Sequence, residues 1–403
     1  MRTELLSFEV ENYRSFCEAQ RLELGEDSSR GVTMLFGPNA GGKSNVAKAL
    51  ACFCNAIVNS ANASWHLPYD PFLLREGWDN RPCKLTARFV SSDGKYLEYS
   101  FSFTATAVTH ERLRERSANS KKMKTVFERD EAGIVNSAAV RSGFSNSLLA
   151  KTRPDTLLVS KGREDNVAYA NYVYELASSI VVISDEMGMD GGRSPYFVNL
   201  LKRDEGLRSA TVDFLKKCDF AIQGFSIEDV SIPGDALDAL PLLPETKAAL
   251  VQSGATAFKT LHVIRDSEQS VVGTRELDFW GQESTGTQRF FREIVPIIDA
   301  IRRGGTVYVD EFGTSVHAEL SKTVLRLFRE GGEEGRARAS LIACTQNLAL
   351  MSKLSREEIV LVDKTMAEES RITPLTNLSV RSGEAFEKRY RAGLYGAVPI
   401  VEQ

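Results

Sequence analysis

The sequence lacks a strong excess of charge of either sign, because 50 Lys and Arg residues stand against 54 Asp and Glu residues in a chain of 403, a formal net charge of −4. A general electrostatic attraction to nucleic acid is therefore not indicated, while a local basic patch stays open. Long apolar runs are also missing, since no stretch approaches the roughly 18 residues that cross a bilayer. The opening residues, MRTELLSFEV, contain no apolar signal-peptide core. We expect a cytoplasmic protein with no membrane partner.

A cysteine pattern that would form disulfides or bind zinc is absent as well. The six cysteines are scattered, and the only close pair, Cys52 and Cys54, lies in an apolar helical stretch. We therefore expect buried thiols that act as small hydrophobic residues. The composition, 42% hydrophobic and 26% charged, is that of a folded protein, and we find no repeat or low-complexity tract. The length allows two or three domains, or one large domain with an insertion.

The N-terminal third has the pattern of strand, glycine loop and helix. Apolar residues alternate along three short segments, the third of which ends at Gly37, and helical spacing begins directly after the loop. Two further alternating segments around a Ser-Ser-Asp-Gly turn predict an antiparallel hairpin. The expected elements are strands at 6–10, 22–24 and 32–36, a helix at 44–58, and strands at 85–90 and 96–103.

The middle of the chain has mixed patterns, which we interpret as an insertion between two parts of one domain. From Glu283 onward helices and strands alternate, which indicates an α/β fold with a largely parallel sheet. The division that we expect is 1–130, 131–275 and 276–403. The expected elements are helices at 167–178, 197–218 (interrupted near Gly206), 245–253, 283–303 and up to about 329, and strands at 180–183, 225–232, 306–310, 341–344 and 359–362.

The segment Gly37–Ser44, GPNAGGKS, satisfies the pattern G-x-x-x-x-G-K-[ST] between an apolar strand and an amphipathic helix. Backbone N–H groups of such a loop converge on phosphates, and the helix adds the positive end of its dipole. Lys43 should reach the β- and γ-phosphates, and the Ser44 hydroxyl should bind Mg²⁺. The alternative is a tight glycine turn without a ligand. The candidate nucleotide-binding residues here are Gly37, Pro38, Asn39, Ala40, Gly41, Gly42, Lys43, Ser44 and Asn45.

The second motif is acidic and ends an apolar strand, in Val307-Tyr-Val-Asp310-Glu311. Asp310 would hold Mg²⁺ directly or through water, and Glu311 would orient and deprotonate the attacking water. Apolar strands that end in Asp-Glu are common, so this interpretation depends on the glycine loop.

Ser284, Gly286 and Gln288 lie at the start of the helix that precedes this strand. Serine and glycine at a helix N-terminus present a hydroxyl and bare N–H groups to an anion, although a plain capping segment is the alternative.

Together these motifs resemble the ABC-type ATPase superfamily, in which S-x-G-x-Q is the signature. The resemblance implies an ATPase head with a mostly parallel sheet, an antiparallel β-subdomain and an inserted mixed or helical lid. It implies ATP and Mg²⁺ as ligands. The choice of ATP over GTP rests on the resemblance, because no motif of the sequence itself reads the base. In that superfamily the signature of one subunit contacts the γ-phosphate held by the other. We therefore expect a head-to-tail dimer, or a larger homo-oligomer.

Asn12-Tyr13-Arg14-Ser15-Phe16 resembles the start of the RecF and SMC branch, where the Arg and Ser lie near the nucleotide. Arg14 as an ordinary surface charge is the alternative. Ser315 and His317 resemble the D-loop of the same branch, which spans the dimer interface, and otherwise His317 is a helix-start histidine. Gln346 occupies the place of the switch histidine of related proteins. A glutamine can hydrogen-bond a phosphate or water but cannot carry a proton, which favours slow hydrolysis.

Three segments narrow the resemblance to the ABC-type ATPases of the AbiLi and RloA abortive-infection group: Pro71–Leu74, Glu283–Gln288 and Lys388–Pro399. This resemblance implies an antiphage sensor or scaffold that controls a separately encoded effector, often a Toprim-like nuclease. Its trigger, a nucleic acid or a phage protein, stays open. A RecF-like ATPase of DNA repair or replication is the alternative, and a transporter subunit has least support.

Two charged clusters allow two interpretations each. Asp185, Glu186 and Asp190 form either a solvated loop, which we favour, or a metal site. The basic residues of 112–116 and 121–124 form either a charged hairpin rim, which we favour, or a loop that contacts phosphate.

Overall fold

The computed structural model describes residues 3–25, 31–134, 139–184, 196–218, 220–230, 255–314, 318–330, 339–379 and 386–395. The chain forms two compact units. The first comprises Met1–Val182, Arg303–Thr314 and Leu325–Gln403, and the second comprises Ile183–Arg302 and Ser315–Val324. Residues 131–182 thus belong to the first unit, and the division expected at 130 and 275 stays a prediction.

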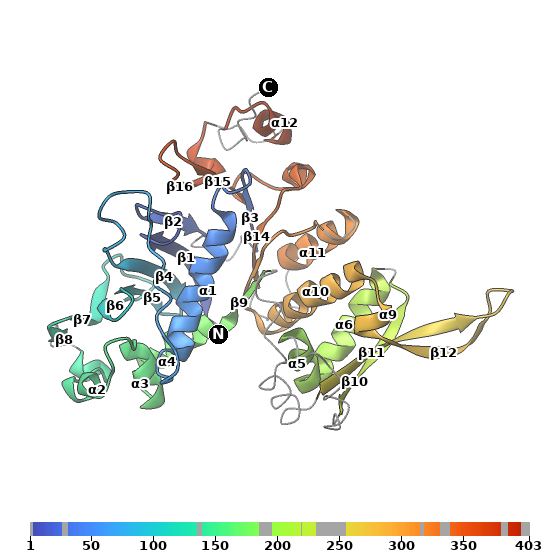
Figure 1. Cartoon of the computed structure of the whole chain (residues 1–403), viewed down its shortest axis with the longest axis horizontal. Coiled ribbons are helices and arrows are strands. Elements are labelled where there is room, and N and C mark those ends of the chain that lie inside the picture. The colour runs from blue at the N-terminus through green and yellow to red at the C-terminus, as the bar shows by residue number, and fades with distance from the viewer. Residues whose placement is uncertain are drawn as a thin grey trace, which may run out of the picture. The chain divides into compact units, whose positions relative to one another are not determined.

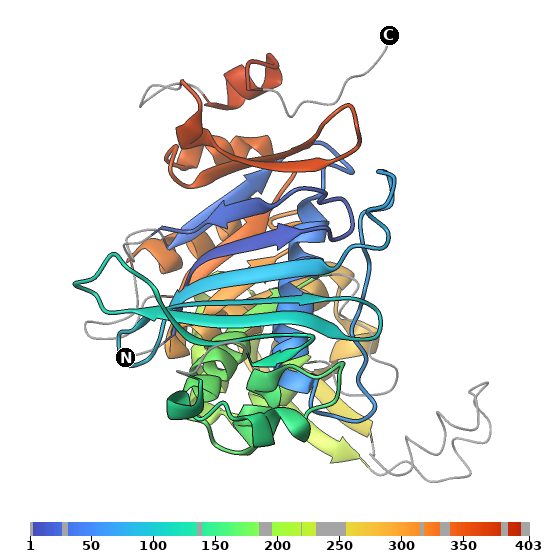
Figure 2. The same cartoon turned by 90° about the vertical axis from the view of Figure 1, so that its left-hand side faces the viewer.

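A seven-stranded antiparallel sheet dominates the first half of the first unit, with the order β2-β1-β4-β5-β6-β7-β8. Figure 2 shows its strands side by side, from blue to teal. Apolar residues alternate along these strands, so one face of the sheet is buried. The strands are β1 (Glu4–Glu11), β2 (Gln20–Glu23), β4 (Cys83–Val90), β5 (Tyr96–Phe103), β6 (Val108–Arg116), β7 (Lys124–Asp130) and β8 (Gly133–Ile134).

A six-stranded sheet forms the other layer of this unit, with the order β16-β15-β3-β14-β13-β9. Its central pairs, β15 with β3, β3 with β14 and β14 with β13, are parallel. Every residue of β3 is buried, as expected for a strand covered on both faces. The strands are β3 (Val32–Phe36), β9 (Ile180–Ile183), β13 (Thr306–Val309), β14 (Ser340–Cys344), β15 (Ile359–Lys364) and β16 (Ser370–Pro374).

Helix α1 (Lys43–Asn59) packs between these two sheets, with β1 and β4 on one side and β3 and β14 on the other (Figure 1). Its apolar positions recur at helical spacing, so a broad face is buried. The ring of Phe53 lies between 5.7 and 6.0 Å from those of Phe8, Tyr99 and Phe101. The remaining helices of this unit are η1 (Val140–Ser142), α2 (Asn146–Ala150), α3 (Leu158–Glu164), α4 (Ala168–Ser179), η3 (Leu348–Lys353), η4 (Leu375–Asn377) and α12 (Phe386–Arg391).

The second unit contains a three-stranded antiparallel sheet in the order β10-β11-β12. Its aromatic centre brings the ring of Phe258 within 5.8 Å of those of Phe279 and Phe291. Its elements within the described residues are α5 (Tyr196–Arg203), α6 (Glu205–Lys217), β10 (Ile222–Val230), β11 (Ala255–Arg265), β12 (Val271–Asp278), α9 (Phe279–Gln282) and α10 (Thr285–Arg303), and α11 (Ala318–Glu330) begins in this unit.

The α/β class with a mostly parallel sheet and an antiparallel β-subdomain is confirmed, and most expected elements are present within a few residues. The expected helix at 197–218 is interrupted near Gly206 as expected, at Asp204, whose carboxylate caps α6 by accepting from the Leu207 N–H. The basic hairpin expected at 112–124 is β6 and β7 with their connection. The helix expected at 245–253, the cluster of Asp185, Glu186 and Asp190, and the residues Ser315 and His317 lie outside the described residues.

Buried thiols are also confirmed. All six cysteines are free, five are buried, and Cys218 is partly exposed. Among the helices that the structure describes, none combines the length and the apolar character that a membrane crossing requires.

Candidate active site

The glycine loop joins the buried strand β3 to helix α1, and its glycines lie too close to other backbone for a side chain. A Cβ on Gly37 would lie 1.8 Å from the carbonyl oxygen of Val362 in β15. Gly42 has a φ of +111°, and a Cβ there would lie 2.1 Å from the hydroxyl of Ser370. The loop is therefore held against β15 and β16, in a conformation that requires glycine.

The N-terminus of α1 has no side-chain cap, because the N-cap residue is Gly42. The first N–H groups of a helix have no partner within the helix, so they are available to an anion. Lys43 folds back over the loop and donates to the carbonyl oxygens of Gly37 and Pro38, each at 2.8 Å. Burial lowers the pKa of Lys43, and the negative charges of Asp310 and Glu311 oppose this effect in part. The Lys43 ammonium therefore contacts the loop and interacts electrostatically with the two acidic residues.

The parallel sheet brings the acidic motif to this loop. β3 and β13 flank β14 and run in the same direction, so their carboxyl ends meet at one edge. The Tyr308 hydroxyl in β13 donates to the carbonyl oxygen of Lys43 at 2.9 Å. The thiol of Cys344, at the end of β14, donates to Asp310 Oδ1. Lys43 and Asp310 therefore belong to a single site.

Glu311 follows Asp310 in a sharp turn. Its φ is +56°, an uncommon conformation for a residue with a side chain. Its N–H faces the sulfur of Cys344 at 3.4 Å, and the next N–H, of Phe312, donates to the Cys344 carbonyl oxygen at 2.8 Å. Such local strain is typical of functional positions, where surrounding contacts maintain it.

Gln346 lies in the connection between β14 and η3, two residues beyond Cys344, and is exposed. The hydroxyl of the preceding Thr345 donates to the Phe312 carbonyl oxygen at 2.8 Å, which ties this connection to the turn after Asp310. Gln346 is therefore in the segment that follows the central strand at the same edge as the acidic residues.

Arg14, Ser15 and Asn45 contact one another beside the glycine loop. Asn45 Nδ2 donates to Ser15 Oγ at 2.7 Å, and Arg14 Nη1 lies 3.5 Å from Asn45 Oδ1. Arg14 also forms an ion pair with Asp70 at 2.7 Å, so part of its charge is compensated. Arg14 thus lies beside the first turn of α1, and Ser15 holds Asn45 in place.

Ser370 is a supporting residue that the sequence did not indicate. Its hydroxyl lies 2.7 Å from Ser15 Oγ and 2.8 Å from the Gly41 carbonyl oxygen. Its N–H donates to the Ser15 carbonyl oxygen at 2.7 Å. Ser370 therefore links β16 to the glycine loop, through a pairing that no local sequence pattern reveals.

Ser284, Gly286 and Gln288, the candidate signature residues, lie in the second unit. Ser284 Oγ accepts from the Thr287 N–H at 3.0 Å, so Ser284 caps α10. Gln288 Nε2 donates to the carbonyl oxygens of Phe279, Trp280 and Glu283 at 2.9 to 3.2 Å, and Gly286 lies between these two residues in the first turn. The side chain of Gln288 thus holds the signature turn together, a role that the sequence did not suggest.

The oxygen donors at the loop fit Mg²⁺. Ser44 is exposed in the first turn of α1, and Asp310 is half-buried at the sheet edge. Hydroxyl and carboxylate oxygens are ligands that Mg²⁺ prefers, and this ion usually keeps waters and phosphate oxygens as its other ligands. Within the described residues no group of three or more His, Cys, Asp or Glu side chains forms a metal cluster. Ser44 and Asp310 are thus the two oxygen ligands that the site offers to such an ion.

No protein-family model matches this sequence, and no curated protein matches it. Among solved structures, the chain is similar to the SMC head domain from Thermotoga maritima, with 13% identity, a TM-score of 0.41, and coverage of 94% of this chain and 100% of that one. It is also similar to the recombination mediator protein RecF of the RecFOR pathway. The RecF structure with ATPrS has 12% identity, a TM-score of 0.39, and coverage of 92% of this chain and 98% of that one. The RecF structure with ATP has 12% identity, a TM-score of 0.37, and coverage of 86% and 94%. With identities of 12 to 13%, these similarities assign no function to the chain, so the function is argued from the geometry of the site.

Proposed function

We propose that this chain binds ATP with Mg²⁺ at the glycine loop and hydrolyses it. The observation that carries the proposal is the meeting of Lys43 and Asp310 at one sheet edge, through the bond from Tyr308 to the Lys43 carbonyl oxygen. The choice of ATP over GTP rests on the resemblance to ABC-type ATPases, and the RecF structures named above with ATP and ATPrS are in keeping with it.

Each residue has a role that follows from its position. The loop N–H groups and the Lys43 ammonium bind phosphate oxygens. To do so, Lys43 gives up its hydrogen bonds to the carbonyl oxygens of Gly37 and Pro38. Ser44 and Asp310 hold Mg²⁺, which, when bound, stabilises the charge that develops on the phosphate oxygens. Glu311 accepts a proton from the attacking water at its carboxylate. Gln346 donates a hydrogen bond toward the phosphate or the water without transferring a proton.

The site is completed by a second copy of the chain in this proposal. Ser284 and Gly286 at the start of α10 present a hydroxyl and bare backbone to an anion, and the resemblance pairs them with the glycine loop of the partner. Arg14, Ser315 and His317 would then lie near the nucleotide or the dimer interface. ATP binding would close the two copies head to tail, and a larger homo-oligomer would be built from such pairs.

Two substitutions test the ATPase proposal. Lys43→Ala should abolish nucleotide binding, while Glu311→Gln should keep binding and lower the turnover rate by about 10² to 10⁴. Binding is measured by titration calorimetry with ATP and GTP, and turnover by phosphate release. Lys151→Ala, at an exposed position outside the loop, is the matched control. A Lys43→Ala protein that hydrolyses ATP at the parental rate would refute the assignment.

Glu311→Gln, alone and combined with a change at Ser284, tests the pairing. ATP should shift Glu311→Gln from monomer to dimer or larger in light scattering after gel filtration, because hydrolysis no longer releases the closed state. Ser284→Glu added to Glu311→Gln should keep ATP binding but remove this shift, since it places a negative charge where the partner's phosphate is expected. A Glu311→Gln protein whose mass does not change with ATP, or a double variant that shifts as Glu311→Gln does, contradicts the shared site.

For the cellular role we propose an antiphage sensor or scaffold that holds a separate effector, such as a Toprim-like nuclease. The three sequence segments that resemble the AbiLi and RloA group support this proposal. Co-purification of a partner under native expression, encoded by a neighbouring reading frame, is the expected result. Absence of any partner counts against it, and a neighbourhood of repair or replication genes favours the RecF-like alternative.

A further inference from the structure

A pocket of about 910 Å³ lies on the antiparallel sheet, and none of its lining residues belongs to the glycine loop or the acidic motif. β1, β2, β4, β5 and β6 contribute side chains, and residues 118–123, in the connection between β6 and β7, form one wall. Along β5, Leu97, Tyr99 and Phe101 are buried, and the last two pack on α1, so Tyr96 and Glu98 face the opposite side. The pocket therefore occupies the face of the sheet that α1 leaves uncovered.

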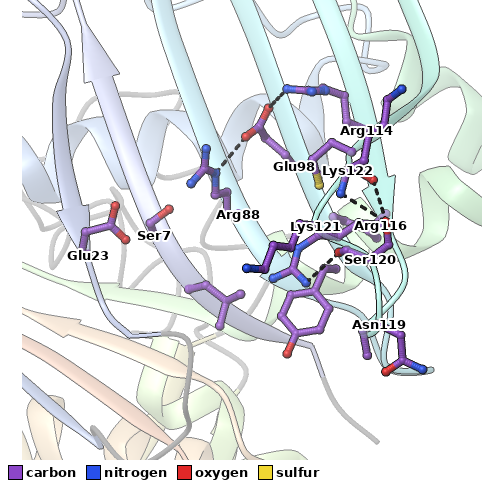
Figure 3. A pocket seen from close by; sticks show the side chains of 15 residues that line it. Ser7, Glu23, Arg88, Glu98, Arg114, Arg116, Asn119, Ser120, Lys121 and Lys122 are labelled. Atoms are coloured by element: carbon purple, nitrogen blue, oxygen red, sulfur yellow. Dashed lines mark hydrogen bonds and ion pairs between the residues drawn. The ribbon is translucent and has the colours of Figure 1, made fainter.

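Positive charge exceeds negative charge in this pocket. Its lining has two carboxylates, Glu23 and Glu98, against five cations, which are Arg88, Arg114, Arg116, Lys121 and Lys122. Glu98 is 6% exposed and accepts from Arg88 at 2.8 Å and from Arg114 at 3.2 Å. One buried carboxylate thus fixes two guanidinium groups without neutralising both. Figure 3 shows this bridge, with Glu98 between Arg88 and Arg114.

The wall opposite Ser7 and Glu23 carries two lysines without a charged partner (Figure 3). Lys121 and Lys122 are exposed, and no ion pair joins either ammonium group to the described part of the chain. The connection itself is ordered by Ser120, whose hydroxyl accepts from the Lys122 N–H at 3.2 Å and whose carbonyl oxygen accepts from Arg116 at 3.4 Å. Two uncompensated charges are thus held at the rim of the pocket.

A planar stack lies within the same pocket. The guanidinium carbon of Arg116 is 3.9 Å from the centroid of the Tyr96 ring. Arginine–aromatic pairs of this kind offer a flat surface on which a nucleobase can stack, beside cations that bind its phosphate. The volume is within the range of about 300 to 1,000 Å³ that small-molecule sites occupy. The pocket combines the two features that nucleotides require.

We propose that this pocket is a second ligand site, which binds the phosphate and base of a nucleotide, either free or within a single strand of nucleic acid. The chain as a whole has a net charge of −4, so attraction is confined to this local excess of positive charge. Lys121 and Lys122 contact the phosphate, Arg88 and Arg114 supply fixed charge, and the stack of Tyr96 and Arg116 receives the base. The site functions without hydrolysis at the glycine loop.

The test uses the full chain and four probes: a fluorescent dT12 strand, the RNA strand U12, ATP, and poly-glutamate. Lys121→Glu combined with Lys122→Glu should weaken binding of the strands at least about tenfold, since these cations supply the salt-dependent part of the affinity. Lys151→Glu combined with Lys353→Glu, at two exposed positions outside the pocket, makes the same change in net charge and should bind like the parent. Equal melting temperatures of the two double variants show that folding is unaffected.

ATP is titrated in the Lys43→Ala background, so that the glycine loop does not contribute, and this separates failure of the pocket from failure of the ATPase proposal. Binding of the strands that depends on Lys121 and Lys122 supports a nucleic-acid strand. Binding of ATP alone with the same dependence supports a free nucleotide. Parental affinity of the Lys121→Glu and Lys122→Glu protein for every probe, absence of binding, or binding of poly-glutamate alone overturns the proposal.

Discussion

Cys344, at the end of β14, supports the candidate site by orienting the carboxylate of Asp310. Its thiol donates to Asp310 Oδ1, and it is 2% exposed. Burial, with the negative charge of Asp310, raises the pKa of this thiol to about 12. At neutral pH the sulfur therefore keeps its proton, and the hydrogen bond orients the carboxylate that we assign to Mg²⁺.

This bond predicts a difference between two substitutions. Cys344→Ala removes the donor and should weaken Mg²⁺-dependent turnover by about fivefold, which corresponds to a hydrogen bond of about 1 kcal/mol. Cys344→Ser keeps an O–H donor and should stay close to the parent. Steady-state phosphate release over a Mg²⁺ titration measures both. Cys54→Ala, another buried cysteine, controls for the loss of a thiol, and equal rates for Ala and Ser at position 344 would contradict the role.

Gly37 gives a second residue-scale prediction. Because a Cβ there would lie 1.8 Å from a backbone carbonyl oxygen, Gly37→Ala must displace β15 or the loop. We expect a loss of at least about 2 kcal/mol in the free energy of unfolding, as for other overpacked sites, together with loss of ATP binding. Gly273→Ala is the control, since a Cβ there meets nothing within 4 Å. Urea denaturation and ATP titration of both variants provide the comparison.

Among the elements, the attachment of α3 to the antiparallel sheet depends on one buried carboxylate. Glu111 of β6 is 0% exposed and pairs with Arg129 of β7 at 2.7 Å. It also accepts from the N–H groups of Leu158 and Val159 at the start of α3, at 2.7 and 3.0 Å. The carboxylate therefore compensates a buried guanidinium and the free N–H groups of a helix terminus at once.

Glu111→Ala should consequently lower the free energy of unfolding by about 3 to 5 kcal/mol, because it leaves a buried charge without its partner. Urea denaturation monitored by circular dichroism measures the change. Glu128→Ala, which removes a partly exposed partner of His110, should cost about 1 kcal/mol or less. Similar losses for the two variants would show that the buried network contributes no more than a surface pair.

The elements also show what local sequence can and cannot predict. The strand, loop and helix around Gly37–Ser44 were predictable because alternation, glycine spacing and helical periodicity all act over a few residues. The strands β11, β12 and β16 were not, because their pairing is set by partners elsewhere. Ser370 supports Gly41 from a position 329 residues away, and nothing in the local sequence around it signals this contact.

At the scale of the whole molecule, the free energy of folding should depend on pH through buried cysteine thiols and a buried tyrosine, which are neutral at pH 7. Burial raises the pKa of Cys17 to about 11 and the pKa of Cys54, Cys83 and Cys344 to about 12, from an ordinary value of 9.0. The pKa of Tyr99 is also raised, chiefly by burial. Above pH 9 the unfolded chain loses these protons before the folded chain does, so rising pH favours unfolding.

The stability that these thiols contribute is therefore fully present below pH 9 and is lost as the pH rises toward 12. Each such group adds a slope of about 1.4 kcal/mol per pH unit in that window. The midpoint of urea denaturation should be constant between pH 7 and 8.5 and should fall steeply by pH 10. Cys54→Ala removes one of the groups, so its decline should be shallower by one such slope, whereas Lys151→Ala should follow the parent. A midpoint that stays constant to pH 10.5 would mean that the cysteines titrate in the folded chain as they do in water, and are therefore not buried in the fold.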